Sequence, residues 1–359
     1  MVELWNIGDV ILTIPFLAQL RAIFPDAETS LLARPYAAEI LAGTGLVDHF
    51  IEADLTWQNE NERFYPFAYD WGELRRVVGA LRRRKFDVAF QCRPHVREYA
   101  LLALSGARRR VGWQRRGWDR TLTDPISLGG SDLQKKDAWL RLLEPFGGPK
   151  AIEMPRLQVS RDERAWAEDF LAANGAGSSS MLVAIHPGAS IAEKRWPLER
   201  FKDVAVDLVR RTGIRVLTFA EPGGYGDSLG QIEGVIPARV GLRQMVALLE
   251  RCGLLICNDS GPMHIAAALG VPTVAVFGSG IDRRFAPLGD QHESVTANLH
   301  TRSVSEGAVT PPPSPGPYED VSEVSTSRVL EATERALQKA RANGVSAGQA
   351  RILLNHGRR

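Results

Sequence analysis

The sequence predicts an α/β protein made of two Rossmann-like domains whose parallel sheets face a central cleft. At 359 residues the chain is longer than one hydrophobic core usually supports, so two domains are expected. Strand and helix signals alternate along both halves, which is typical of βαβ units and a parallel sheet. The apolar fraction of 44% and the lack of an internal repeat indicate an ordinary globular α/β protein.

The first half is predicted to begin with a short strand, a turn and a helix. These are Val2–Trp5, Asn6–Asp9 and Val10–Phe24, and Pro15 lies inside the helical periodicity of the last. The other elements expected here are strands over Thr29–Ala33 and Phe86–Gln91, a long loop or hairpin over Asp54–Asp70, and a basic amphipathic helix over Glu73–Arg84.

A domain boundary is expected near Pro145–Pro155, where Gly147-Gly148-Pro149 interrupts the pattern, so the domains are 1–150 and 151–320. The elements expected in the second domain are helices over Arg161–Asn174, Leu198–Arg211 and Leu242–Glu250, and strands over Leu182–Ile185, Arg215–Phe219, Leu254–Cys257 and Thr273–Phe277. After a turn-rich connector over Thr310–Pro317, residues 321–359 are expected to form a helix over Val324–Asn343 that packs back toward the first domain, and then a frayed basic tail.

The most informative segment joins the last two of these strands. Asp259-Ser260-Gly261-Pro262 offers an N-cap, a small flexible residue and a proline suited to a first helical turn. A helix that starts just past the carboxyl end of a strand points free backbone N–H groups at a crevice, which favours an anion such as phosphate. The segment therefore predicts a phosphate-binding turn.

Two further segments carry candidate chemistry. His186–Ser190 follows a predicted strand with small residues that let a ligand approach the backbone, and Lys194 or Arg195 can neutralise a phosphate. Near the start, Asp9 is open to two interpretations. It is either a helix-start residue that interacts with the helix dipole, or a general base for a hydroxyl group.

Together the three segments resemble glycosyltransferase family nine, the ADP-heptose:lipopolysaccharide heptosyltransferases and their relatives. The resemblance runs from Trp5 to Pro287 and is carried by Ile7–Pro15, His186–Ser190 with Lys194–Pro197, and Asn258–His264 through Gly278. It implies a GT-B fold with the acceptor on the first domain and the sugar nucleotide on the second. It also implies inverting transfer of a heptose or related sugar from ADP-heptose or another nucleotide diphosphate sugar, with no cofactor and no active-site metal.

The resemblance also suggests roles for individual residues. It implies Asp9 as the catalytic base and Lys194 as a donor-phosphate ligand. The pyrophosphate turn would be Ser260, Gly261 and Pro262, and the donor sugar and nucleoside would meet Asp259, His264, Met263 and Ser190. For His264, a buried structural histidine at a sheet–helix junction is an equally open interpretation.

The segment Arg75–Arg120 holds 14 Lys or Arg against 3 acidic residues. It is either a solvated basic helix face or a surface for an anionic partner. On the second interpretation Arg93, Arg115 and Arg116 contact an acidic glycolipid or glycan acceptor, and the protein binds the anionic inner face of the plasma membrane. A cytoplasmic, peripheral monomer is expected. No RNA- or DNA-binding motif supports a nucleic-acid partner.

Two alternative functions keep the same fold: a GT-B sugar-nucleotide epimerase, and a non-catalytic relative that binds sugar nucleotides or glycans. The Gly8-Asp9 turn favours transfer. The chain departs from the family pattern because no Glu lies in clear register after Arg215–Phe219, and because Trp57–Trp71 resembles an insertion. Cys92, Cys252 and Cys257 show no metal-binding spacing, and Cys252 and Cys257 are expected to be core thiols, as suits the cytoplasm.

Overall fold

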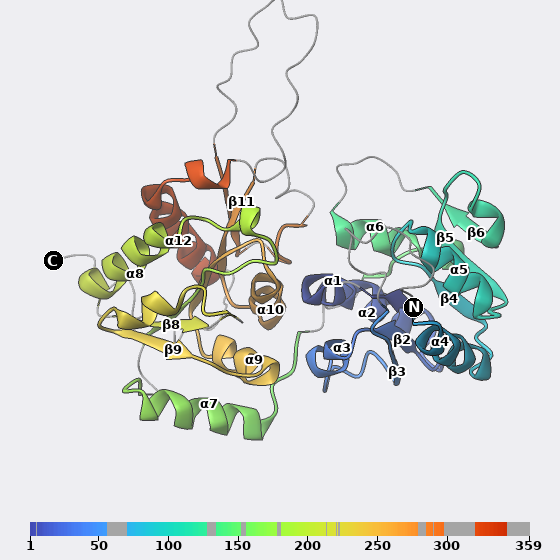
Figure 1. Ribbon diagram of the computed structural model, residues 1–359, viewed down its shortest axis with the longest axis horizontal. Coiled ribbons are helices and arrows are strands. Elements are labelled where there is room, and N and C mark those ends of the chain that lie inside the picture. Colours follow the sequence, from blue (N-terminus) through green and yellow to red (C-terminus); the bar gives the residue numbers. More distant parts are fainter. Residues whose placement is uncertain are drawn as a thin grey trace, which may run out of the picture. The chain divides into compact units, whose positions relative to one another are not determined.

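A computed structural model describes the chain in two compact units, Met1–Gln158 and Val159–Arg359 (Figure 1). The residues described are 1–4, 6–55, 70–127, 134–151, 156–177, 181–212, 214–219, 221, 223–278, 285–289, 291–297 and 320–342. Most of the expected loop over Asp54–Asp70, the connector over Thr310–Pro317 and the basic tail lie outside these residues.

The first unit contains two short parallel sheets joined by one bridge, with a strand-order reversal where they meet. Its strands are β1 (Val2–Glu3), β2 (Ser30–Ala33), β3 (His49–Glu52), β4 (Val88–Phe90), β5 (Arg109–Trp113) and β6 (Asp124–Ile126). They form two three-stranded sheets, β1-β2-β3 and β4-β5-β6, and a parallel bridge between Val2 and Gln91 joins β1 to the end of β4. The resulting order is β3-β2-β1-β4-β5-β6, so the switch point lies between β1 and β4.

The helices of the first unit are α1 (Ile7–Leu12), α2 (Ile14–Ile23), α3 (Tyr36–Ile40), α4 (Trp71–Arg83), α5 (Val96–Leu104) and α6 (Lys135–Arg141). The single helix predicted over Val10–Phe24 is two helices, and the first begins inside the predicted turn. Asn6 caps α1, and the Oδ2 atom of Asp9 accepts the Asn6 backbone N–H at 3.3 Å. The break falls at Thr13, before Pro15 in the first turn of α2, a position that proline favours.

The second unit repeats the same strand order. Its strands are β7 (Leu182–His186), β8 (Arg215–Phe219), β9 (Val235–Ala238), β10 (Leu254–Asn258), β11 (Thr273–Phe277) and β12 (Glu293–Thr296). All neighbours pair in parallel in the order β9-β8-β7-β10-β11-β12. Strands β7, β10 and β11 are buried along their whole length, as expected for a parallel sheet covered on both faces. The switch point lies between β7 and β10.

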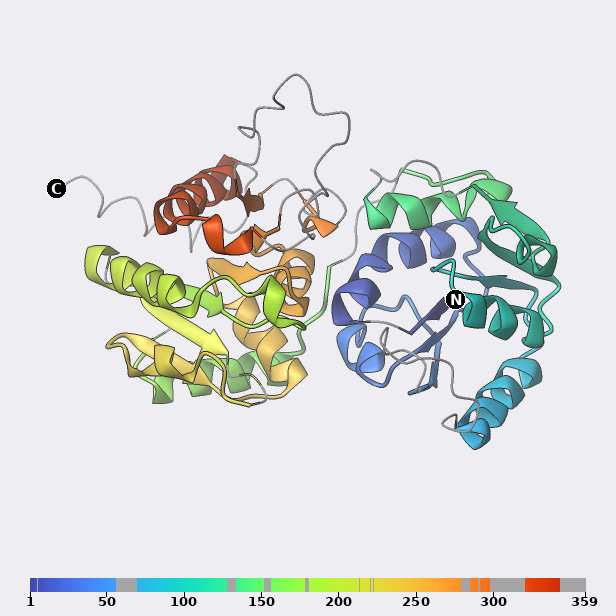
Figure 2. The ribbon, with the colours of Figure 1, turned by 45° about the horizontal axis from the view of Figure 1, so that its top comes forward.

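Helices cover both faces of this second sheet. They are α7 (Arg161–Ala173), α8 (Leu198–Thr212), α9 (Leu242–Glu250), α10 (Gly261–Leu269) and α12 (Thr326–Ala342). Figure 2 shows α8 and α12 on one side, where they share a hydrophobic core with the sheet, and α7 and α9 on the other. Short 3₁₀ turns lie at Asp119–Thr121, Glu144–Phe146, Ala192–Lys194, Asp227–Gln231 and Val321–Glu323.

The C-terminal helix packs within the second unit. Val329, Ala332 and Ala336 of α12 are buried in the core of that unit. Its apolar stripe matches that sheet because α12 contacts β11, β12 and α8. None of the helices in the described part of the chain combines the length and apolar character needed to cross a membrane.

Candidate functional site

The two predicted donor-binding segments meet at the switch point of the second sheet. His186 ends β7 and lies opposite Cys257 of β10 in the parallel register. The loop that begins with Pro187 and the turn that begins with Asp259 therefore leave the sheet side by side at its carboxyl edge. In open parallel sheets this is the usual place for a ligand.

Asn258 joins these two loops. Its side chain is completely buried, and its Oδ1 atom accepts the backbone N–H of Trp196 at 3.0 Å. Its Nδ2 atom donates to the carbonyl oxygens of Pro187 at 2.6 Å and Gly188 at 3.3 Å. One amide at the end of β10 thus fixes the loop that follows β7 and the backbone beside Lys194.

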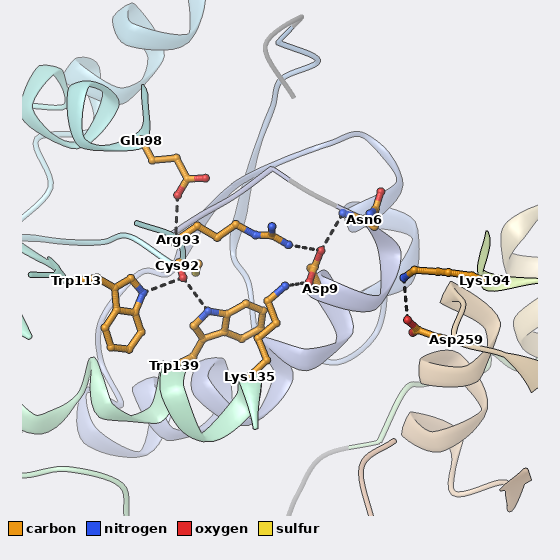
Figure 3. Close-up of polar contacts among 10 residues, drawn as sticks. All are labelled: Asn6, Asp9, Cys92, Arg93, Glu98, Trp113, Lys135, Trp139, Lys194 and Asp259. Carbon is orange, nitrogen blue, oxygen red and sulfur yellow. Dashed lines mark hydrogen bonds and ion pairs between the residues drawn. The ribbon is translucent and has the colours of Figure 1, made fainter. Parts of the chain in front are cut away.

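Lys194 and Asp259 form an ion pair at this edge. The Nζ atom of Lys194 lies 2.7 Å from the Oδ2 atom of Asp259, and their side chains are 18% and 8% exposed (Figure 3). Lys194 ends a 3₁₀ turn, and Asp259 directly follows β10. The ammonium is thus held beside the start of α10, in a place that suits an anion.

The turn into α10 has the geometry that the sequence predicted. Ser260 is the extended N-cap residue, Pro262 lies in the first turn, and Ser260, Gly261 and Pro262 are all half-buried. Met263 and His264 are buried, whereas Ser190 is exposed in the loop after β7. Ser260 Oγ lies 3.4 Å from Nδ1 of His186, a second link between the two loops.

A carboxylate that the sequence did not place in register lies at the same edge. Glu221 comes two residues after β8, and its Oε1 atom lies 3.7 Å from Nε2 of His186. A Cβ atom added to Gly188 would lie 1.6 Å from the Glu221 Oε1 atom, so the glycine makes room for this carboxylate.

Burial shapes the ionisation of this cluster. Burial raises the pKa of Glu221, and the charge of Arg195 partly offsets this rise. Burial also lowers the pKa of His186 to about 4, so the imidazole is neutral at pH 7. The Arg195 guanidinium lies over the Tyr225 ring at 4.4 Å and 3.7 Å from Glu221, which places its charge at the open side of the cluster.

The first unit brings a second set of predicted residues together at its own switch point. Asp9 is 7% exposed, and its Oδ2 atom accepts from Nη2 of Arg93 at 2.6 Å (Figure 3). Its Oδ1 atom accepts from Nζ of Lys135, the first residue of α6. Burial by itself would raise the pKa of Asp9, but the charges of Lys135 and Arg93 outweigh it and hold that pKa below its ordinary value.

A single backbone carbonyl lies behind the two cations. The Cys92 oxygen accepts the indole N–H groups of Trp113 and Trp139, each at 2.9 Å. Arg93 directly follows Cys92, and its backbone N–H donates to Glu98 at 3.3 Å. Both tryptophans are almost fully buried, so this carbonyl is a fixed point of the unit.

The basic segment does not form one continuous face. Many of its arginines are engaged locally, as in the pairs Arg76–Glu73, Arg108–Asp87 and Arg109–Asp124. Arg93 binds Asp9, and the Arg115 guanidinium donates to the Pro94 carbonyl while Arg116 is exposed. Arg93 and Arg115 follow β4 and β5, so they lie at the carboxyl edge, whereas the exposed run Arg82–Lys85 precedes β4.

Sequence reasoning missed Lys135, Glu221 and Asn258 as site residues. Asn258 carried a signal, because it ends a buried strand directly before the phosphate turn. Lys135 and Glu221 carried little, because their contacts arise only from the fold. Within the residues that the structure describes, no group of three or more His, Cys, Asp or Glu side chains could hold a metal ion.

A comparison with known protein families identifies one family. Residues 74–310 match the family described as Glycosyltransferase family 9 (heptosyltransferase). The chain is 24% identical over 351 residues to lipopolysaccharide heptosyltransferase 2 of Salmonella typhimurium, which covers 90% of this chain and 94% of that protein.

Two solved structures show the same fold. A glycosyl transferase family 9 protein from Veillonella parvula superposes with a TM-score of 0.78 at 24% identity, covering 94% of this chain and 96% of that one. The E. coli heptosyltransferase WaaC with ADP-2-deoxy-2-fluoro heptose gives a TM-score of 0.66 at 17% identity, covering 93% and 98%.

Proposed function

Because the chain belongs to glycosyltransferase family 9, we propose that this glycosyltransferase moves a heptose or related sugar from a nucleotide diphosphate to a lipopolysaccharide core or another cell-envelope glycan. The observation that carries the proposal is the ion pair of Lys194 and Asp259 beside the start of α10. The similarity to lipopolysaccharide heptosyltransferase 2 over most of both chains supports the acceptor class.

The proposed donor is ADP-heptose or another nucleotide diphosphate sugar, bound by the second unit. Lys194 and the backbone N–H groups of Ser260 and Gly261 at the start of α10 would stabilise the leaving diphosphate, and Pro262 would shape the turn that presents them. The sugar and nucleoside would contact Asp259, Met263, His264 and Ser190, with Glu221 as an added candidate. The ADP-2-deoxy-2-fluoro heptose in the related WaaC structure supports an ADP donor.

In the proposed reaction Asp9 is the general base and the anomeric centre inverts. An acceptor hydroxyl oxygen forms a bond to C1 of the sugar while the bond from C1 to the diphosphate oxygen breaks. The hydroxyl proton passes to the Asp9 carboxylate, and the nucleotide diphosphate leaves with the bonding electrons. The lowered pKa keeps Asp9 ionised at pH 7, as a base must be. No step uses a metal ion.

The proposed acceptor is an acidic glycolipid or glycan bound by the first unit. Arg93, Arg115 and Arg116 are the candidate contacts, and exposed arginines such as Arg83 would attract an anionic membrane surface. The protein would then act as a monomer at the cytoplasmic face of the inner membrane. Flotation with anionic and neutral vesicles at two salt concentrations tests this, because equal binding under all conditions would contradict it.

The central experiment incubates the purified protein with ADP-heptose and a heptose-deficient lipopolysaccharide. Mass spectrometry should detect acceptor that has gained one heptose, and NMR of the product should show an inverted anomeric centre. A free epimerised sugar nucleotide formed without acceptor would favour the epimerase. Donor binding without turnover on any envelope acceptor would favour a non-catalytic binding protein.

The matched variants for this experiment are Asp9→Asn and Asp26→Asn. Asp9→Asn should lower turnover by about 10²–10⁴-fold, because it removes the base but keeps the size of the side chain. Its donor affinity by calorimetry should not change, because the proposed donor residues belong to the other unit. Asp26 is exposed, so Asp26→Asn should behave like wild type. Unchanged turnover in Asp9→Asn would remove the base assignment.

A further inference from the structure

The hydrogen bonds around Asp9 leave its carboxylate with little capacity to accept further hydrogen bonds. A carboxylate offers about four acceptor positions, two on each oxygen. Its Oδ2 atom already accepts from Arg93 and from the Asn6 backbone N–H, and its Oδ1 atom accepts from Lys135. Within the described residues, one position therefore remains, and it lies on Oδ1, the oxygen that Lys135 holds.

Lys135 reaches Asp9 from a rigid support. It is 8% exposed at the start of α6, one turn before Trp139, and its ammonium lies 5.3 Å from the centre of the Trp139 ring. The Trp139 indole donates to the Cys92 carbonyl, and Arg93 is the next residue along the chain. The two cations that bind Asp9 are thus set relative to each other through one carbonyl (Figure 3).

We propose that Lys135 is the positioning residue for the Asp9 base. Its ammonium, fixed through Trp139 and the Cys92 carbonyl, would keep the carboxylate ionised and turn Oδ1 so that a single lone pair stays available for the acceptor hydroxyl. The inference rests on the proposed function, since it names the device that prepares its base. Arg93 then holds the other carboxylate oxygen, Oδ2, in addition to its proposed contact with the acceptor.

Removing the lysine charge should change how Asp9 titrates. Burial opposes the charged form of this carboxylate, so without Lys135 only Arg93 and the Asn6 N–H would hold it ionised. The other titratable groups around the pair are Glu3 of β1, Tyr36 of α3, Cys92 and Arg93 after β4, and Glu98 of α5, with Arg34 beside Tyr36 and the Met1 amino group beside Cys92. Burial lowers the pKa of that amino group to about 6, and Arg34 acts on Tyr36, so Arg93 is the remaining cation that bonds to Asp9 itself.

The first test compares the pH dependence of kcat in the wild type and in Lys135→Met. An opposite charge at this distance lowers a carboxyl pKa by about 1–3 units, so its loss should move the acidic limb up by about 1–3 pH units. The KM for the donor should stay the same. Lys136→Met is the control, because Lys136 pairs with Asp137, and its limb should not move. Lys135→Arg keeps the charge and should return the limb toward wild type.

A lower kcat in Lys135→Met with an unmoved limb would overturn the proposal, because a merely structural lysine would give that result. An equal loss in Lys135→Arg with a shifted limb would likewise contradict a role for the charge.

The second test needs no enzymatic activity. Urea midpoints are measured at pH 7 for wild type, Asp9→Asn, Lys135→Met and the double variant. If Lys135 holds Asp9, the double variant should lose clearly less than the sum of the single losses, because either substitution breaks the same contact. Additive losses would overturn the proposal. If no sugar transfer is found but the losses are coupled, the proposed function fails while the hold of Lys135 on Asp9 stands.

Discussion

At Asp9, a local structural role and a proposed catalytic role use different parts of one side chain. The Oδ2 atom caps the start of α1 through the Asn6 N–H and receives Arg93, while the Oδ1 atom receives Lys135. The sequence left a helix-start role and a base role as alternatives for this residue. The geometry shows that the first does not exclude the second, because a carboxylate has enough lone pairs for both.

The charge of Lys194 should matter for both donor binding and turnover. Replacing it with Met should raise the transition-state free energy by about 2–4 kcal/mol if its charge meets the leaving diphosphate in a site with little water. The loss also leaves Asp259 as a buried carboxylate without its cation, so Lys194→Met with Asp259→Asn should bind donor better than Lys194→Met alone. Donor Kd and kcat/KM report both effects. Lys202→Met, on the exposed side of α8, is the control.

His186 should make the stability of the protein depend on pH. Its pKa of about 4 lies below the ordinary value of 6.5, so the unfolded chain binds the proton more tightly than the folded one. Its contribution to the free energy of unfolding is therefore fully present above pH 6.5 and decreases as the pH falls toward 4. Between pH 7.5 and pH 5 the loss should be about 2 kcal/mol.

Urea titrations at these two pH values check the His186 prediction. The drop should be smaller by that amount in His186→Asn, and His49→Asn, with its partly exposed ring, should retain the wild-type drop. An undiminished drop in His186→Asn would show that other groups cause it.

At the scale of elements, Asn258 should be essential to the second unit. Asn258→Asp keeps the shape but removes both Nδ2–H donors and sets a carboxylate against the Pro187 and Gly188 carbonyls. Each buried polar group left unsatisfied costs about 1–3 kcal/mol, so the free energy of unfolding should fall by about 2–6 kcal/mol. Urea denaturation measures this loss. Asn174→Asp, at the exposed end of α7, should cost far less.

Elements with a clear apolar pattern could be predicted from the sequence almost to the residue. Helix α9 and strand β11 have the predicted bounds, because β11 is buried at every position and α9 buries the apolar residues of its second half. Strand β5 was not predicted, because it opens with Arg109 and Arg110, whose charges are satisfied only by the folded surroundings. Pro125 likewise obscures the short strand β6.

The same distinction applies to the candidate site. The loops after β7 and β10 have short local sequence patterns, so the sequence predicted them. Lys135 lies 126 residues from Asp9 along the chain, and no local pattern links them. Glu221 fits at this edge because Gly188 leaves the space for its carboxylate.

At the scale of the whole molecule, the two units share one strand order and have separate cores. Each therefore presents two loops at a switch point without help from the other. ADP should then slow amide hydrogen exchange in the segments 186–195 and 258–264, with the core strands of the first unit unchanged. Exchange measured by mass spectrometry with and without ADP tests this. Protection confined to the first unit would contradict the donor assignment.

The carbonyl shared by Trp113 and Trp139 gives the first unit a built-in optical reporter. Two buried indoles hydrogen-bonded to one oxygen respond together when that oxygen moves, and the ammonium above Trp139 adds a nearby charge that shifts emission. Steady-state fluorescence, with single Trp→Phe replacements to identify each emitter, could thus follow the protonation of the neighbouring carboxylate without any label.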